Sequence, residues 1–245
     1  MKTSDARKHY LAEIDAQRRP EPGKKVRGTQ GLNAMLRAVP QHPAGEFNEP
    51  DEDVLVCSDL HLGHENIIKY CDRPFLDVGD MNRTLWDYMH AALAPDKVLV
   101  VVGDLAMREA LSAATWKQVR ELDCRGRHLV LGNHDLTGAG QLRVQGFDHV
   151  WSLLVSGGEP PLIWTHYPLN EVPNGYINIH GHVHDNPPRQ TPHINVSVEQ
   201  LDYEPASLLG LRALAKVLVQ GEYPAGKTTL ARLQDIGVVK TALRR

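Results

Sequence analysis

Six short apolar runs, each ending in a cluster of polar residues, constrain the fold of this chain more than any other feature of its sequence. Such runs are typical of strands buried within a sheet. Stretches with apolar residues at helical spacing, residues 81–93 and 108–122, lie between several of these runs. Because strands alternate with helices along the chain, the sequence predicts an α/β fold. The predicted strands are residues 54–57, 98–102, 128–131, 162–164, 177–179 and 194–198.

The length and composition are those of a chain with one substantial core. Domains usually contain about 100–200 residues, and this chain has 245, of which 42% are hydrophobic and 23% charged. We expect the core domain to span residues 51–205. Residues 1–50 contain five prolines and four glycines with little apolar periodicity, which predicts a polar extension or linker that docks loosely. Residues 206–245 contain seven basic and two acidic residues and are predicted to form a basic C-terminal extension, packed on the domain or trailing it.

Several classes of protein are disfavoured by the sequence. No apolar run approaches the roughly 18 residues of a membrane-spanning helix, and the polar first ten residues lack the apolar stretch of a secretion signal. We therefore expect a cytoplasmic protein without a membrane partner. The three cysteines, Cys57, Cys71 and Cys124, have no close CxxC spacing, so neither a disulfide framework nor a thiolate zinc site is expected.

Ligand-type side chains follow five of the predicted strands directly. Asp59 and His61 are two residues apart at an extended strand end, so their side chains point the same way and could bind one ion. In α/β folds, ligands gather beyond the carboxyl ends of strands. Four of the 13 histidines also lie within residues 179–193, a bunching that favours metal ligation. The residues after the other four strands are Gly103-Asp104, Gly132-Asn133-His134-Asp135, Thr165-His166 and His180-Gly181-His182-Val183-His184.

The order D-x-H, G-D, G-N-H-D, H and G-H-x-H over residues 54–198 resembles the signature of the calcineurin-like metallophosphoesterases. The resemblance implies an α/β sandwich in which two facing mixed β-sheets are flanked by helices, with a two-metal site at strand ends. It implies that one metal is held by Asp59, His61, Asp104 and His184. It implies that the other is held by Asp104, Asn133, His166 and His182, so that Asp104 bridges.

The implied activity is hydrolysis of phosphate esters. Nitrogen and oxygen ligands with a neutral asparagine suit borderline and hard divalent ions, and Mn²⁺ is favoured here over Fe or Zn²⁺. Two cations about 3.5–4 Å apart lower the pKa of a shared water and supply a bridging hydroxide at neutral pH. His134 occupies the position that the family reserves for catalysis, where protonation of the leaving oxygen contributes about 10²–10⁴-fold.

Two features indicate the substrate class: a difference from the motif of the Ser/Thr protein phosphatases and the charge of the core domain. The longer GDxxDRG motif of the Ser/Thr protein phosphatases has Met107 here in place of its second aspartate, which disfavours protein phosphatase activity. The sequence is more similar to small phosphodiesterase-like members, many of them bacterial or phage proteins. We therefore expect small phosphodiesters, including cyclic nucleotides, as substrates. The alternatives are a phosphomonoesterase, a nuclease of the same superfamily and a non-catalytic metal-binding scaffold.

Nucleic acid is a disfavoured partner, because residues 51–205 contain 11 basic and 22 acidic residues and a nuclease usually presents a basic groove. Two side chains near the motifs are candidates for substrate binding. Arg108 occupies the arginine position of the longer motif and could clamp a phosphate, and His64 lies three residues past His61. Asp135 has two interpretations, orienting its neighbour or closing the turn. His180 and His193 are expected outside the site.

Residues 221–228 match the phosphate-binding pattern G-x-x-x-x-G-K-[ST] letter for letter. Only seventeen residues follow Thr228, too few for the remaining parallel sheet of a nucleotide-binding core. The segment is therefore predicted to be a turn before a final helix or strand.

Overall fold

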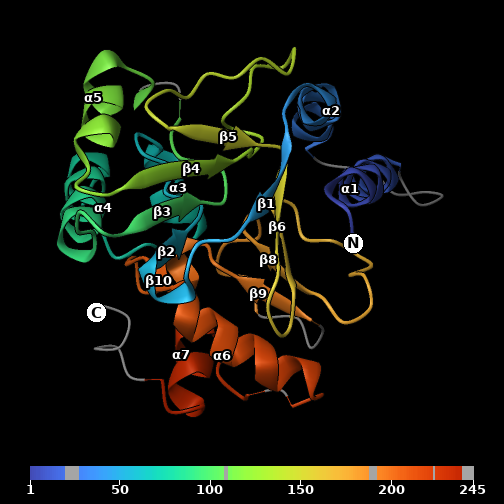
Figure 1. The fold of residues 1–245 in the computed structure, drawn as a ribbon. Helices are drawn as coiled ribbons and strands as arrows, with labels where there is room; N and C mark the ends of the chain where they lie inside the picture. Colours follow the sequence, from blue (N-terminus) through green and yellow to red (C-terminus); the bar gives the residue numbers. More distant parts are fainter. Residues whose placement is uncertain (20–27, 108–109, 188–191, 223, 239–245) are drawn as a thin grey trace.

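The computed structural model describes residues 1–19, 28–107, 110–187, 192–222 and 224–238. They form two five-stranded mixed sheets with helices on their outer sides (Figure 1), which confirms the predicted architecture. The first sheet has the order β10-β2-β3-β4-β5, from Ala206–Ser207, Val54–Cys57, Val98–Val101, Gly126–Val130 and His149–Trp151. The second has the order β1-β6-β7-β8-β9, from Ala44–Phe47, Leu153–Ser156, Leu162–Thr165, Ile177–His180 and His193–Asn195.

Strand direction in each sheet determines where the polar ends gather. Strands β2, β3, β4 and β5 are parallel to one another, and only the edge strand β10 runs antiparallel in that sheet. In the second sheet β7, β8 and β9 are parallel, whereas β6 and β7 are antiparallel. Because parallel strands end at the same edge, the segments after β2, β3 and β4 meet one another, as do those after β7 and β8.

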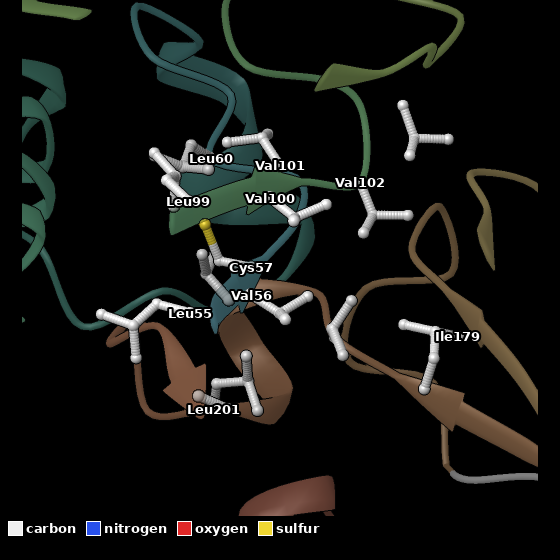
Figure 2. Close-up of a cluster of buried hydrophobic side chains, with 14 of the residues drawn as sticks. Leu55, Val56, Cys57, Leu60, Leu99, Val100, Val101, Val102, Ile179 and Leu201 are labelled. Atoms are coloured by element: carbon white, nitrogen blue, oxygen red, sulfur yellow. The ribbon is translucent and has the colours of Figure 1, made fainter. Parts of the chain in front are cut away.

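The apolar runs that form β2, β3, β7 and β8 lie in the interior, where other parts of the protein cover both faces of each strand. All four residues of β2, β3, β7 and β8 are buried, the pattern expected of parallel strands with layers on both sides. Figure 2 shows side chains of β2 and β3 in one cluster with Ile179 of β8, so the two sheets share a core.

Two helices cover the outer face of the first sheet, α4 (Val78–Ala92) and α5 (Ala113–Glu121), and their buried side chains join the same core. Each helix starts at a side chain that accepts a hydrogen bond from its first turn, Asp77 for α4 and Ser112 for α5, as N-capping requires. The short helix α3 (Glu65–Tyr70) follows β2. Helices α6 (Leu208–Val219) and α7 (Thr229–Asp235) follow β10 and pack against each other.

Residues 1–50 differ from the loosely docked arm that the sequence predicts. Helices α1 (Thr3–Arg18) and α2 (Thr29–Ala38) pack on the β6 and β7 side of the second sheet, and β1 pairs in parallel with β6. Ala6, Tyr10 and Ile14 are completely buried. These three residues recur every four positions, so they form a narrow apolar stripe that the polar composition of the segment hides.

The described part of residues 206–245 also packs against the core domain. Strand β10 pairs with β2, and five leucine and alanine side chains of α6 lie in the main core. None of the helices within the described residues is long and apolar enough to cross a membrane.

Candidate metal centre

Two clusters of ligand-type atoms lie where the ends of the two sheets meet. Asp59, His61 and His184 offer atoms that all lie within 4.8 Å of one another, and so do Asp104, His166 and His182. These residues follow β2, β3, β7 and β8, as the sequence predicts. The structure thus brings together side chains that are up to 125 residues apart in the chain.

Asp59 is fixed through one of its two carboxylate oxygens. Oδ2 accepts hydrogen bonds from Ser58 Oγ at 2.6 Å, from Ser197 Oγ at 2.9 Å and from the backbone N–H of His182 at 2.9 Å. Oδ1 is buried and has no hydrogen-bond partner within the described part of the chain. One oxygen is therefore saturated by the protein, and the other remains available for a cation.

Asp104 lies between the two clusters. Its Oδ2 is 3.2 Å from His166 Nε2 and 3.6 Å from His61 Nε2, one histidine from each cluster. Its Oδ1 accepts a hydrogen bond from the backbone N–H of His134 at 2.8 Å. A carboxylate in this place can contribute to two neighbouring ions.

One histidine of each cluster is oriented by its other ring nitrogen. His166 Nδ1 is 2.8 Å from the carbonyl oxygen of Val102, and His184 Nδ1 is 3.0 Å from Glu199 Oε1. Such contacts fix the tautomer of metal-binding histidines and direct Nε2 toward the ion. Among the side chains that the motifs imply as ligands, four further buried atoms have no hydrogen-bond partner within the described part of the chain: both ring nitrogens of His61, Nε2 of His166 and Oδ1 of Asn133.

Buried polar atoms normally have partners, and these five unpartnered nitrogens and oxygens belong to residues that gather around Asp59 and Asp104. The donor set of imidazoles, carboxylates and one amide oxygen fits borderline or hard divalent cations. The residues present therefore fit the metal centre that the motifs imply.

The carboxylates shift the pKa of His166 strongly. Burial disfavours the imidazolium, but the nearby charges of Asp104 and Asp59 outweigh it and raise the pKa of His166 to about 10. Burial also opposes the charged form of Asp104, yet His166 and its neighbours hold the pKa of this carboxyl well below its usual range. For His182, burial dominates and lowers the pKa to about 3. A cation binding here must displace the proton of His166.

The backbone at these positions is strained. Asp59, His61, Asp104, His182 and His184 all have positive φ angles, between 49° and 71°. Non-glycine residues in the left-handed region are uncommon and cluster at functional sites, where the surrounding structure fixes them. Five of the ligand-type residues are thus held in a conformation that no sequence pattern predicts.

Two glycines allow the loops to approach one another. A Cβ on Gly132 would lie 2.2 Å from Asp104 Oδ1, and a Cβ on Gly181 would lie 2.3 Å from Asp59 Oδ2. Both contacts are far shorter than van der Waals distance, so any side chain at either position would push a carboxylate out of place.

Of the two interpretations of Asp135, orienting its neighbour or closing the turn, the contacts support the second. Its carboxylate accepts hydrogen bonds from the backbone N–H groups of Gly132, Asp104 and Leu105 at 2.8, 3.0 and 3.1 Å. Burial and the nearby Asp104 raise the pKa of Asp135 to about 7. The loop that carries Asn133 and His134 is therefore tied to the loop after β3.

Two buried charged residues beside the site were missed by the sequence reasoning. Arg73 Nη2 lies 2.7 Å from Glu199 Oε1, and its guanidinium also donates to the carbonyl oxygens of Asp59 and Leu60. Glu199 in turn contacts His184. Arg73 lies in the stretch after the D-x-H motif and Glu199 follows β9, but no spacing rule singles out either of them.

His134 and His64 lie at the open side of the centre. The His134 side chain is 38% exposed, and its Nε2 is 4.0 Å from Asp104 Oδ2. Its ring centroid is 5.0 Å from that of His61, and the His64 ring is 5.4 Å from His61 and 6.5 Å from His134. Burial lowers the pKa of His64 to about 4. Arg108, the other candidate for substrate binding, lies outside the described residues.

The two flanking histidines make contacts outside the clusters. His180 Nδ1 lies 2.9 Å from the carbonyl oxygen of Gly181, and His193 Nε2 lies 2.7 Å from that of Leu169. Neither belongs to a cluster of potential metal ligands within the described residues.

The segment that matches a phosphate-binding loop caps a helix. Thr228 Oγ1 accepts from the backbone N–H of Ala231 at the start of α7, and the N–H of Gly226 donates to Asp235 Oδ2 at 2.8 Å. A phosphate-binding loop needs such N–H and hydroxyl groups to bind its ligand, whereas here they form hydrogen bonds within the protein. Tyr223 of this segment lies outside the described residues.

Fold and site together define a metallophosphoesterase. Residues 53–222 match the calcineurin-like phosphoesterase family, and the chain belongs to it. An uncharacterized protein of Methanocaldococcus jannaschii is 35% identical over 167 residues, which are 63% of this chain and 86% of that protein.

Two other proteins are similar over smaller parts or at lower identity. A symmetrical bis(5′-nucleosyl)-tetraphosphatase of a Janthinobacterium species is 37% identical over 98 residues, 38% of this chain and 35% of that protein. The crystal structure of a protein of unknown function from Aquifex aeolicus superposes with a TM-score of 0.53 at 22% identity. It covers 66% of this chain and 98% of its own, and it supports the fold alone.

Proposed function

We propose that this chain hydrolyses small phosphodiesters at a centre of two divalent metal ions. The observation that carries the proposal is the convergence of unpartnered buried ligand atoms around Asp59 and Asp104. In this proposal Asp59, His61, Asp104 and His184 hold one ion, and Asp104, Asn133, His166 and His182 hold the other. When bound, two such ions supply hydroxide at neutral pH and stabilise the charge that develops on ester oxygens. Mn²⁺ is the favoured metal.

His134 is proposed as the catalytic residue. Its backbone N–H is held by Asp104 Oδ1, so the residue is fixed next to the centre while its ring reaches a cavity. From this position the imidazole can donate a proton to the oxygen that leaves. His64, close to both His134 and His61, is proposed to contact the substrate from the other side.

Two features disfavour protein phosphatase activity and a non-catalytic scaffold. Met107 lines the cavity beside His134, where a protein phosphatase has an aspartate partner for this histidine. A scaffold without catalysis would not need Asp104, Asn133 and His134 together. The tetraphosphatase activity in the name of the Janthinobacterium relative favours a second candidate, hydrolysis of phosphoanhydrides in small nucleotides.

The test is a panel of substrates with metal-stripped protein reloaded with Mn²⁺. It contains a bis-aryl phosphate, an aryl monoester, 2′,3′- and 3′,5′-cyclic nucleotides, a dinucleoside tetraphosphate and single-stranded nucleic acid. Turnover of diesters above monoesters is expected. No turnover of any ester would refute the proposal.

A variant isolates the role of His134. We expect His134→Ala to lose about 10²–10⁴-fold in turnover with two metal ions still bound. His90→Ala, an exposed histidine on α4, is the matched control and should keep full activity. Retained turnover in His134→Ala would exclude the assigned role.

A further inference from the structure

A cavity of about 240 Å³ lies beside His134, and part of its wall comes from outside the region that matches the family. Gln30, Gly31 and Ala34 of α2 form this part of the wall. The rest comes from the loops that carry the site: Met107, Asn133, His134, Leu136, Thr137, Gly138 and Arg143. The cavity therefore opens next to the proposed proton donor, on the side of the N-terminal helices.

The far wall is a tight hairpin that begins at the site itself. Leu136 and Leu142 form an antiparallel bridge, and the N–H of Arg143 donates to the carbonyl oxygen of Asp135 at 2.8 Å. Thr137 and Gln141 close the tip through a hydrogen bond of 2.8 Å. The hairpin thus returns Arg143 to Asp135, the residue after His134, and Asp135 is anchored by three backbone donors.

Helix α2 is fixed against this hairpin. Arg37 Nη1 donates to the carbonyl oxygen of Gly138 at 2.6 Å, and a Cβ on Gly140 would lie 2.7 Å from Arg37 Cβ. At the other end, a Cβ on Gly31 would lie 3.1 Å from Asn133 Cβ. Because α2 touches both the hairpin and the loop of the centre, its position sets the size of the cavity.

The charge of the cavity favours an anion. Arg143 carries the only permanent charge among the described residues that line it. Arg143 is half-buried as a residue, and its guanidinium has no hydrogen bond or ion pair to any residue that the structure describes. None of these lining residues has a carboxylate, and Gln30 and Thr137 add neutral donors. A guanidinium in such a site suits the bidentate geometry of a phosphate.

We propose that Arg143 is a specificity-determining residue that binds a second phosphate group of the substrate, in the cavity closed by α2. The preferred substrates are then phosphate esters that carry another phosphate on the group facing this cavity. This inference rests on the proposed hydrolysis at the metal centre and goes beyond it, because the family match does not include α2.

A matched substrate pair tests the inference. The Mn²⁺-loaded full chain is assayed with thymidylyl-(3′→5′)-thymidine, with and without a phosphate on the 3′-oxygen of the second nucleoside, and release of that nucleoside is followed by chromatography for both. We expect a higher kcat/KM for the substrate with the second phosphate. Arg143→Gln should remove this preference through a KM about 10–100-fold higher for that substrate, with little effect on the other.

Two variants and a control keep the test decisive. Gln30→Glu places a carboxylate on the α2 wall and should also raise KM for the doubly phosphorylated substrate alone, whereas Arg143→Lys should retain part of the preference. Arg83→Gln, which removes an exposed arginine of α4, should change neither substrate. Melting temperature checks that each variant is folded.

The outcomes separate the two proposals. If the wild type hydrolyses neither ester, the proposed function fails and the inference fails with it. If the wild type is active but shows no preference, or if Arg143→Gln affects both esters equally, the inference alone is overturned.

Discussion

Replacing Glu199 by glutamine tests how far the metal centre depends on charges outside the proposed ligand set. Glu199 Oε1 contacts His184 Nδ1 at 3.0 Å and Arg73 Nη2 at 2.7 Å. The side chains of Glu199 and Arg73 are 3% and 0% exposed. Glutamine keeps the shape and one acceptor oxygen, so the substitution removes the charge and little else.

Two separate losses are expected from this change. Removal of a partner that orients a metal-binding histidine typically lowers metal affinity about 10–100-fold, which is roughly 1.4–2.7 kcal/mol of binding free energy. The Arg73 guanidinium also loses its counter-charge while it stays buried, and breaking a buried ion pair costs about 3–5 kcal/mol. Because glutamine still accepts a hydrogen bond, we expect a loss near 3 kcal/mol.

Two measurements distinguish these effects. Mn²⁺ titration of metal-stripped protein by calorimetry gives the affinity, and urea unfolding in chelator gives the free energy of unfolding without metal. Glu121→Gln is the control, because Glu121 forms an exposed helical pair with Lys117 that contributes only about 0.2–0.5 kcal/mol. Affinity within twofold of the wild type, together with lower stability, would show that Glu199 does not orient His184.

Three further predictions concern the loops and the proton balance of the centre. Gly181→Ala places a Cβ 2.3 Å from Asp59 Oδ2 and should lower Mn²⁺ affinity at least about tenfold; Gly157→Ala, whose Cβ meets nothing within 4 Å, should not. Asp135→Ala leaves three backbone N–H groups without their acceptor, each worth about 1–3 kcal/mol, so urea unfolding should show a loss of about 3 kcal/mol or more; a loss below about 1 kcal/mol would contradict this. The pKa of His166 is raised to about 10, so protonation of this side chain stabilises the folded, metal-free protein at low pH. This contribution to the free energy of unfolding is lost as the pH rises through that value. Because metal displaces this proton, binding at pH 7 should release about one proton, which calorimetry in buffers of different ionisation enthalpy detects; zero release would refute the assignment.

The core strands could be predicted because their sequence pattern and their burial have the same cause. The runs at 54–57, 98–102 and 162–164 are continuously apolar since both faces of β2, β3 and β7 are covered. Strand β1 (AGEF) and strand β5 (HVW), which lie at sheet edges and are only partly buried, were not predicted. Strand β6 (LLVS) was not predicted either, although it lies inside its sheet and all four of its residues are buried. Edge strands need fewer apolar residues, so their pattern is weak.

The N-terminal helices illustrate another limit of sequence patterns. In α2, Leu32, Met35 and Ala38 are buried, but a ten-residue helix preceded by a glycine-rich, basic stretch offers too few positions for a clear period. The helix packs against the hairpin around residues 136–142, which is distant in sequence. Contacts of this kind cannot be predicted from local composition.

The proposed ligands could be predicted as a set, because parallel strands bring their carboxyl ends to one edge and the motifs follow those ends. Their supports could not be predicted. Ser197 holds Asp59 and Glu199 holds His184, yet both come from the turn after β9, where no motif lies. Serine and glutamate are common in turns, so only the folded structure distinguishes a support from a surface residue.

The left-handed backbone at the site explains why these supports are needed. Residues such as Asp59, His61 and Asp104 cost of order 1–3 kcal/mol each in this conformation, and burying their polar atoms without partners adds to that cost. Hydrogen bonds to Asp59 Oδ2 and Asp104 Oδ1 offset part of it. Asp59 Oδ1 has no hydrogen-bond partner among the described residues, and Asp104 Oδ2 faces a histidine of each cluster. A cation that binds those oxygens stabilises the strained loops, so metal removal should lower the melting temperature of the wild type more than that of Asp104→Asn.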